Sequence, residues 1–173
     1  MSANLDRPAA DEFAPYYAGY ISRVPDGDIV ATIEGQIGDT LALLRAIPEP
    51  RGDHRYALDK WSIKDIIGHV SDTERVMAYR ALRIARADQT PLSGFDQDPW
   101  VQAARFGTRS VASLATELEH VRASTVDLLR SFDDADFLRR GTANGVSLTP
   151  RALAWIMAGH ERHHVALLRE RYL

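Results

Sequence analysis

The last stretch of the chain, residues 149–173, constrains the fold most, because it carries clear signals for a long helix. Thr149 is a favourable N-cap, and Pro150 stands where the first helical residue is expected. Apolar residues and two histidines then recur at steps of three and four: Leu153, Met157, His160, His164 and Leu167. This spacing predicts a helix that runs almost to the C-terminus, with His160 and His164 on its inward face.

Two inward histidines one helical turn apart can act as ligands of one metal ion. Their Cβ atoms would lie about 5–6 Å apart, which lets both rings reach an ion at about 2.0–2.1 Å. The alternative is a pair of core histidines without metal, which would require two separately satisfied hydrogen-bond networks. The spacing of His160 and His164 leaves both interpretations open.

Three earlier segments repeat apolar residues at helical spacing, over residues 26–48, 62–86 and 110–132. Their inward positions are Ile29, Ile33, Ile37, Leu41 and Leu44, then Ile66, Val70, Thr73, Met77, Ala81 and Ile84, then Leu114, Leu118, Val121, Thr125, Leu128 and Phe132. Four amphipathic helices, without a convincing strand or an internal repeat, predict an all-α four-helix bundle. Its second and third helices are joined by one long connection.

The segments between these helices are irregular. Residues 1–25 mix prolines with aromatic residues and predict an irregular arm that lies against the body, which leaves residues 26–173 as the bundle domain. Residues 87–109 are long enough for a functional loop or a short helix, and they are the predicted rim of a site. Residues 133–148 turn the chain through two glycines into the last helix.

The 87–109 connection offers three candidates for the wall of that site. Phe95 and Trp100 are candidate apolar walls, and Asp96 is a candidate polar group at the rim. An aspartate in such a loop also stabilises turns, so Asp96 is a weak catalytic candidate.

His69 is the natural third partner of the two C-terminal histidines. At about 100° per residue it lies about 60° from Ile66, on the edge of the second helix's apolar stripe, and is predicted to be half-buried. Bundles build metal sites from side chains on facing helices, which favours His69 as a ligand. His54, among charged residues, and His120, off its stripe, are predicted to be solvated and without a role.

Composition excludes several classes of function. The chain has 21 Lys and Arg against 24 Asp and Glu, a net charge of −3, so no positive field favours nucleic acid. It has no cysteine, so any metal must be bound by histidine or carboxylate. No apolar run approaches a membrane span and the first residues lack signal-peptide features, so a cytoplasmic location without membrane contact is expected.

Residues 160–164 also match H-E-x-x-H, the zinc-peptidase helix in which the glutamate is the general base. Peptidase patterns of this kind generally take a further ligand downstream, and little chain follows His164. Glu161 is therefore a weak catalytic candidate, and the other interpretation is a surface carboxylate paired with an arginine.

Three groups of residues occur in order along the chain: Trp61-Ser62 with His69, Asp72 and Glu74, then Phe95-Asp96 with Trp100, then His160, His163 and His164. Their combination resembles the DinB-like superfamily, in particular its YfiT-like branch. The resemblance covers roughly residues 26–173.

The resemblance implies an up-down-down-up bundle that holds a divalent metal, with zinc and nickel among the candidates. The implied ligands are one histidine of the second helix and an H-x-x-x-H pair of the last, which correspond to His69, His160 and His164. Family members include transferases of bacillithiol, mycothiol or glutathione and proteins described as metal-dependent hydrolases. A homodimer is also implied.

Three histidine ligands leave a fourth position for water or substrate, as in catalytic metal sites. We therefore expect a metal-dependent enzyme with a small-molecule substrate. It would transfer a low-molecular-weight thiol, as cosubstrate, to an electrophile, or hydrolyse its substrate. The alternative is a non-catalytic bundle in which the metal only joins two helices.

Overall fold

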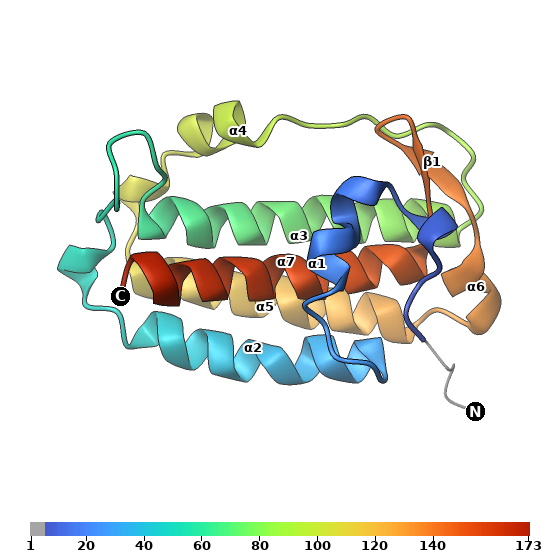
Figure 1. Cartoon of the computed structure of the whole chain (residues 1–173), viewed down its shortest axis with the longest axis horizontal. Coiled ribbons are helices and arrows are strands. Elements are labelled where there is room, and N and C mark those ends of the chain that lie inside the picture. The colour runs from blue at the N-terminus through green and yellow to red at the C-terminus, as the bar shows by residue number, and fades with distance from the viewer. Residues whose placement is uncertain (1–5) are drawn as a thin grey trace.

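The structure is a computed structural model that describes residues 6–173, so the first five residues of the predicted arm lie outside it. Four long helices form the predicted four-helix bundle (Figure 1). They are α2 (Ile29–Arg45), α3 (Ile63–Ala85), α5 (Val111–Arg130) and α7 (Pro150–Arg171). None of the helices within residues 6–173 is long and apolar enough to span a membrane.

The chain direction of the helices follows the up-down-down-up order. α2 and α7 run from right to left in Figure 1, whereas α3 and α5 run from left to right. α3 packs against α5 and α7, and α2 packs against the same two helices. Because α3 and α5 are parallel neighbours, the chain between them must return along the whole bundle. This return carries α4 (Gln97–Ala104) and the 3₁₀ turn η4 (Phe106–Thr108).

Each long helix begins at a polar side chain that caps it. Asp28, Ser62, Ser110 and Thr149 all accept hydrogen bonds from backbone N–H groups of the first turn. These groups have no partner within the helix, so a capping oxygen fixes where the helix starts. The predicted starts of the last three helices are therefore confirmed. The first helix was predicted to start at Asp26 or Asp28, and Asp28 is its cap.

The bundle core consists of two apolar clusters with a polar layer between them. One cluster holds Leu153 to Ala158 of α7 with four residues of α3, which are Met77, Ala81, Ile84 and Ala85. The other holds Leu168 of α7 with four residues of α3, which are Ile63, Ile66, Ile67 and Val70. Between these levels the buried side chains are polar. They include Thr40, His69, Thr73, Glu74, Arg122, Thr125, His160, Glu161 and His164, and we call this set the polar layer.

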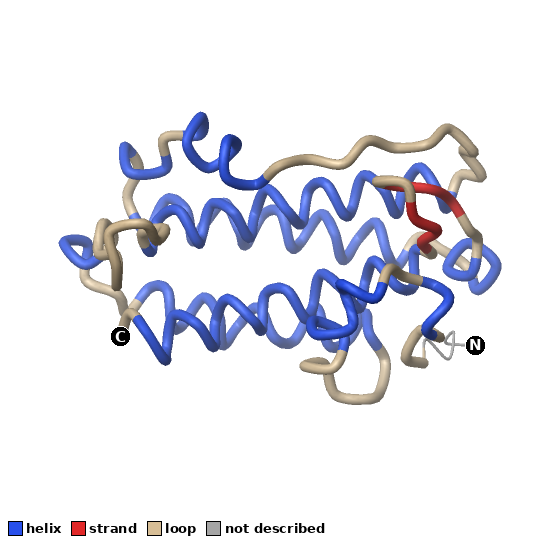
Figure 2. Tube along the Cα trace, turned by 45° about the horizontal axis from the view of Figure 1, so that its top comes forward, coloured by secondary structure: helices blue, strands red, loops and turns tan. Residues whose placement is uncertain are grey.

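The segment before α7 contains more structure than the predicted turn. It forms α6 (Asp134–Leu138) and a hairpin of β1 (Gly141–Ala143) and β2 (Val146–Leu148), shown in red in Figure 2. Asn144 and Gly145 at its tip have φ of 51° and 75°, as a two-residue hairpin turn requires. The expectation of no strand was therefore wrong. The Asn-Gly pair was the signal for the hairpin.

The hairpin fixes the path of the α3–α5 connection. Leu92 donates its N–H to Thr142 O at 2.9 Å and accepts one from Asn144 N at 2.9 Å. This pairing holds the connection beside the bundle just before Phe95 and Asp96.

The arm consists of short turns. They are η1 (Ala10–Glu12), η2 (Pro15–Tyr17) and α1 (Ala18–Ile21), and a further turn, η3 (Glu49–Arg51), follows α2. α1 packs on α7. The buried Glu12 accepts hydrogen bonds from Thr149 Oγ1 at 2.8 Å and Arg151 Nε at 3.0 Å, which attaches the arm to the start of α7.

Candidate metal centre

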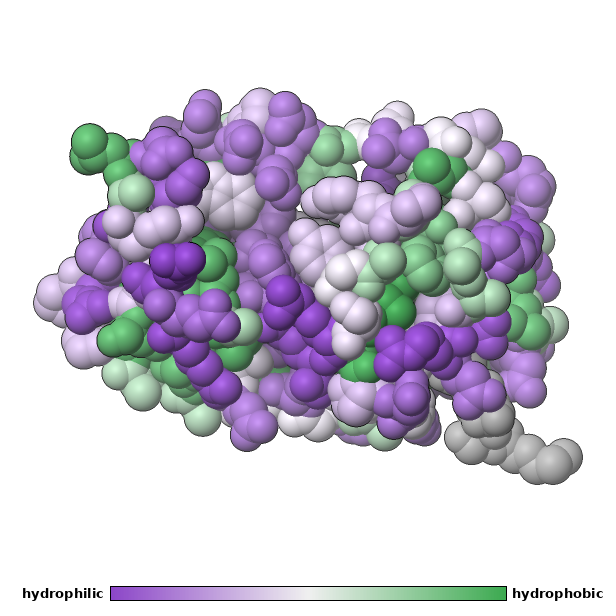
Figure 3. Space-filling view, viewed as in Figure 1, coloured by the Kyte–Doolittle hydropathy of each residue, from purple (hydrophilic) through white to green (hydrophobic). Residues whose placement is uncertain are grey.

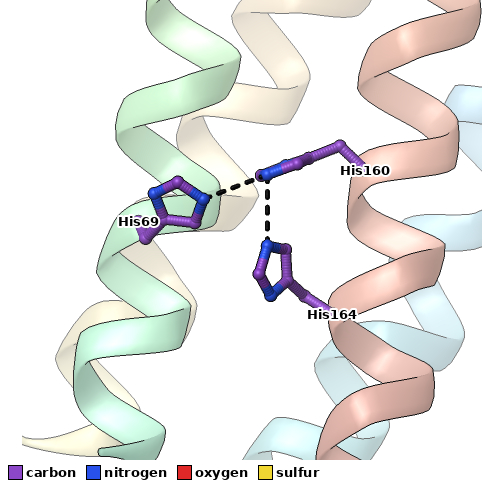
Figure 4. Close-up of side chains that lie close together, drawn as sticks. All are labelled: His69, His160 and His164. Carbon is purple, nitrogen blue, oxygen red and sulfur yellow. Dashed lines mark hydrogen bonds between the residues drawn. The ribbon is translucent and has the colours of Figure 1, made fainter. Parts of the chain in front are cut away.

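Three buried histidine rings converge at the middle of the bundle (Figure 4). His69 extends from α3, and His160 and His164 extend from successive turns of α7. His160 Nε2 lies 3.0 Å from His69 Nε2 and 3.1 Å from His164 Nε2. The ring centroids are 4.5–5.0 Å apart. The three histidines form the group of potential metal ligands found in the described part of the chain.

This donor set fits a divalent ion better than a hydrogen-bonded cluster. Ligand nitrogens about 2.0–2.1 Å from a tetrahedral ion are about 3.3 Å apart, close to the observed separations. A neutral imidazole carries only one N–H, so protons on these rings satisfy the three converging nitrogens poorly. Within residues 6–173, His164 Nδ1 is the one buried side-chain nitrogen or oxygen with no hydrogen-bond partner.

The three rings are held in the neutral state that metal binding requires. Burial lowers the pKa of His69 to about 4. Burial, and then the neighbouring imidazoles, hold the pKa values of His160 and His164 well below their usual range. At neutral pH these side chains are therefore neutral, with one ring nitrogen of each free of a proton, so an incoming metal ion does not have to compete with an imidazolium proton.

His69 is buried rather than half-buried, which corrects the prediction from its position on the helical wheel. The first turns of α3 are covered on all sides, and the Trp61 ring lies 4.6 Å from the His69 ring. Thr73 Oγ1 lies 3.4 Å from His69 Nδ1, which orients the ring. His54 and His120 are exposed, as predicted.

A pocket of about 410 Å³ opens onto two of the histidines, His69 and His160. It lies between the arm and the α3–α5 connection, where the space-filling view is hollowed between α4 and the arm (Figure 3). Phe95 and Asp96 line the pocket, as expected from the sequence. Asp96 also caps α4 through a hydrogen bond from Asp98 N at 3.2 Å, so it stabilises the local turn as well as lining the pocket, and its catalytic role stays a prediction.

Trp100 does not line this pocket. It packs against Phe95, with the ring centroids 4.8 Å apart, and faces a different groove. The reason is that α4 begins directly after Asp96, so Trp100 follows a helical path instead of an extended one.

Three lining residues, Tyr16, Tyr17 and Tyr20, belong to the arm, and the sequence analysis did not assign them to the site. The Tyr20 ring lies 5.4 Å from the His160 ring and 5.5 Å from the His163 ring, edge to face. The run of aromatic residues among prolines predicted that the arm packs against the bundle, but not where.

Gly159 of α7 determines how closely the arm can approach. A Cβ atom at this position would lie 2.0 Å from the Tyr20 carbonyl oxygen. We expect Gly159→Ala to displace the arm at a cost of about 1–3 kcal/mol. Amide exchange of residues 15–24 should become about 5- to 150-fold faster, which is the factor that corresponds to this cost. Gly38→Ala in α2, where nothing lies within 4 Å, is the matched control. Unchanged exchange in Gly159→Ala would contradict this role.

Glu161 is not a surface carboxylate, because its side chain is 2% exposed. Its Oε2 accepts a hydrogen bond from Arg122 at 2.8 Å and its Oε1 accepts one from Thr40 at 2.5 Å. The same arginine binds both oxygens of Glu74, at 2.9 and 2.7 Å. The expected arginine partner exists, but the pair is buried, and Glu161 is not among the residues that line the histidine pocket.

The fold and the site together define an up-down-down-up helical bundle with a three-histidine centre. The family model of the DinB superfamily matches residues 32–168, and the chain belongs to this superfamily. A comparison of this chain with curated proteins found no match.

Two solved structures share the fold. YfiT from Bacillus subtilis, described as a probable metal-dependent hydrolase with an unusual four-helix bundle topology, matches with a TM-score of 0.71 and 16% identity over 96% of this chain and 95% of that one. A mycothiol-dependent maleylpyruvate isomerase matches with a TM-score of 0.68 and 15% identity. That match covers 84% of this chain but only 61% of the isomerase.

Proposed function

We propose that His69, His160 and His164 bind one divalent ion and that the protein is a metal-dependent enzyme acting on a small molecule. The observation that carries this proposal is the convergence of three Nε2 atoms beside an open pocket. Imidazole ligands suit both zinc and nickel, the two metals we propose. The description of YfiT as a probable metal-dependent hydrolase supports the same class.

The metal would supply a positive charge that stabilises bound hydroxide or a thiolate at neutral pH. The three histidines would hold it as neutral nitrogen donors, which in a tetrahedral site would leave one position for a further ligand. Tyr20 and Phe95 provide aromatic walls for the pocket. Asp96 provides a carboxylate that can accept a hydrogen bond or a proton from a substrate.

We propose a low-molecular-weight thiol as cosubstrate, with hydrolysis as the second candidate reaction. The chain has no cysteine, so a reacting thiol must come from outside the protein. The structural similarity to a mycothiol-dependent isomerase favours thiol chemistry. For Glu161 we propose a structural role, because its carboxylate is bound by Arg122 and Thr40.

A cytoplasmic location and a homodimer complete the proposal. The dimer is proposed from the family resemblance, and light scattering tests it directly. The net charge of −3 supports the absence of nucleic acid as a partner.

Cobalt substitution tests whether the metal site is open. We expect one Co²⁺ per chain, and a new sulfur-to-cobalt absorption band when 2-mercaptoethanol is added, because the fourth position is exchangeable. The control is His120→Gln, because His120 is exposed. This variant should give the same cobalt spectra as the wild type. Stoichiometric cobalt whose spectrum does not respond to thiol, azide or water exchange would instead support the non-catalytic bundle.

A further inference from the structure

The buried charged side chains of the described residues are paired with one exception, Arg80. The seven are Glu12, Lys64, Asp65, Glu74, Arg80, Arg122 and Glu161. Six form ion pairs, while Arg80, 3% exposed, forms none within residues 6–173. Because an unpaired buried charge is destabilising, a guanidinium in this position favours the binding of an anionic partner.

The contacts of Arg80 are neutral. Its Nη2 donates to Ser93 O at 2.8 Å, and its Nη1 lies 3.8 Å from Met77 Sδ. The guanidinium carbon is 5.9 Å from the centre of the Phe95 ring. Two acceptors for five N–H groups leave donors for a further partner.

Arg80 lines a groove of about 540 Å³ between α3 and the α3–α5 connection. Its walls are mainly apolar, with Val76 and Tyr79 on one side and Leu92, Phe95 and Trp100 on the other. Tyr79 and Trp100 are large aromatic side chains left 52% and 45% exposed.

The charged side chains that line this groove, among the described residues, are all positive. Its charged lining residues within the described chain are Arg75, Arg80 and Arg83, and no acidic residue lines it. Arg75 is already paired with Asp72 and Glu117, and Arg83 with Asp88. Arg80 is therefore the cation available to a ligand, in a protein whose overall charge is negative.

We propose that this groove binds a small apolar carboxylic acid, with the carboxylate on Arg80 and the aromatic or aliphatic body between Tyr79 and Trp100. A planar guanidinium binds a carboxylate through two parallel hydrogen bonds. The volume suits a small molecule, since ligand pockets are typically about 300–1,000 Å³. Phe95 lines both this groove and the histidine pocket, so the two are neighbouring sites. None of the three histidines lines the groove, so binding there does not require the proposed metal.

Calorimetric titration with 1-naphthoate and its uncharged analogue 1-naphthamide tests the proposal. In the full-length protein treated with chelator, we expect naphthoate to bind at least about tenfold more tightly than the amide. Arg80→Gln should remove this preference while leaving amide binding unchanged. The control is Arg130→Gln, because Arg130 is an exposed arginine of α5 that pairs with Glu34 of α2. It should behave as the wild type.

Trp100→Ala provides a second variant that retains Arg80. This variant should weaken the binding of naphthoate and of naphthamide by a similar factor, because it removes an apolar wall and no charge. Equal affinity for naphthoate and naphthamide in the wild type would overturn the proposal. So would naphthoate binding that disappears on chelation, because the ligand would then bind a metal. Neither result affects the cobalt experiment, so the carboxylate site and the metal site can be refuted independently of each other.

Discussion

Replacing His160 with Ala is expected to reduce bound metal from one ion per chain to less than about 0.1, because tight binding at a tetrahedral site needs three protein ligands. His160 Nε2 is the nitrogen that lies next to both of the others, at 3.0 and 3.1 Å. Its loss leaves His69 and His164 on different helices without the ligand between them. Plasma mass spectrometry of the purified protein measures the change.

The control for this experiment is His120→Ala, because His120 is exposed on α5. It should retain a full complement of metal. Any activity found for the protein should be lost together with the metal in His160→Ala. Full metal occupancy in that variant would refute the three-histidine site.

Replacing Arg122 with Ala is expected to lower the free energy of unfolding by about 3–5 kcal/mol, the effect of removing one partner of a buried ion pair. Arg122 is 1% exposed and pairs with both Glu74 and Glu161, so the substitution leaves two buried carboxylates without a counter-charge. It also removes the hydrogen bond to Ile33 O at 2.8 Å. Urea unfolding measures the change.

Arg130→Ala is the matched control, since its ion pair with Glu34 is half-exposed and should contribute less than about 1 kcal/mol. A triple variant, Arg122→Met with Glu74→Gln and Glu161→Gln, should recover much of the lost stability, because it removes the charges together. If Arg122→Ala unfolds at the same urea concentration as the wild type, the buried network does not stabilise the fold.

The helices were predictable because their signals are local. Each of the last three long helices starts at an N-cap, which is Ser62, Ser110 or Thr149. The apolar side chains spaced by three and four residues follow each cap within a few turns of the same helix. Four such stripes must bury their apolar faces together, which indicated the bundle. Inward histidines on two of these helices then indicated where a metal could be bound.

The parts that the sequence did not reveal depend on contacts between distant residues. Tyr20 reaches His160, and Arg122 links Glu74 to Glu161, through packing that no local pattern encodes. Glu161 looked like a surface residue because its partners lie 39 and 121 residues away, in Arg122 and Thr40. The hairpin is different, because Asn144-Gly145 was a local signal that the analysis overlooked.

The polar layer between the two apolar clusters also determines how the helices are aligned along their axes. Apolar faces alone tolerate sliding by one turn, about 5.4 Å, because one aliphatic side chain can replace another. Arg122 cannot slide in this way without separating from Glu74 on α3 and Glu161 on α7, which would strand buried charges. The ion pairs thus fix the position of α3 relative to α7 along the bundle axis. That alignment is the one in which His69 meets His160.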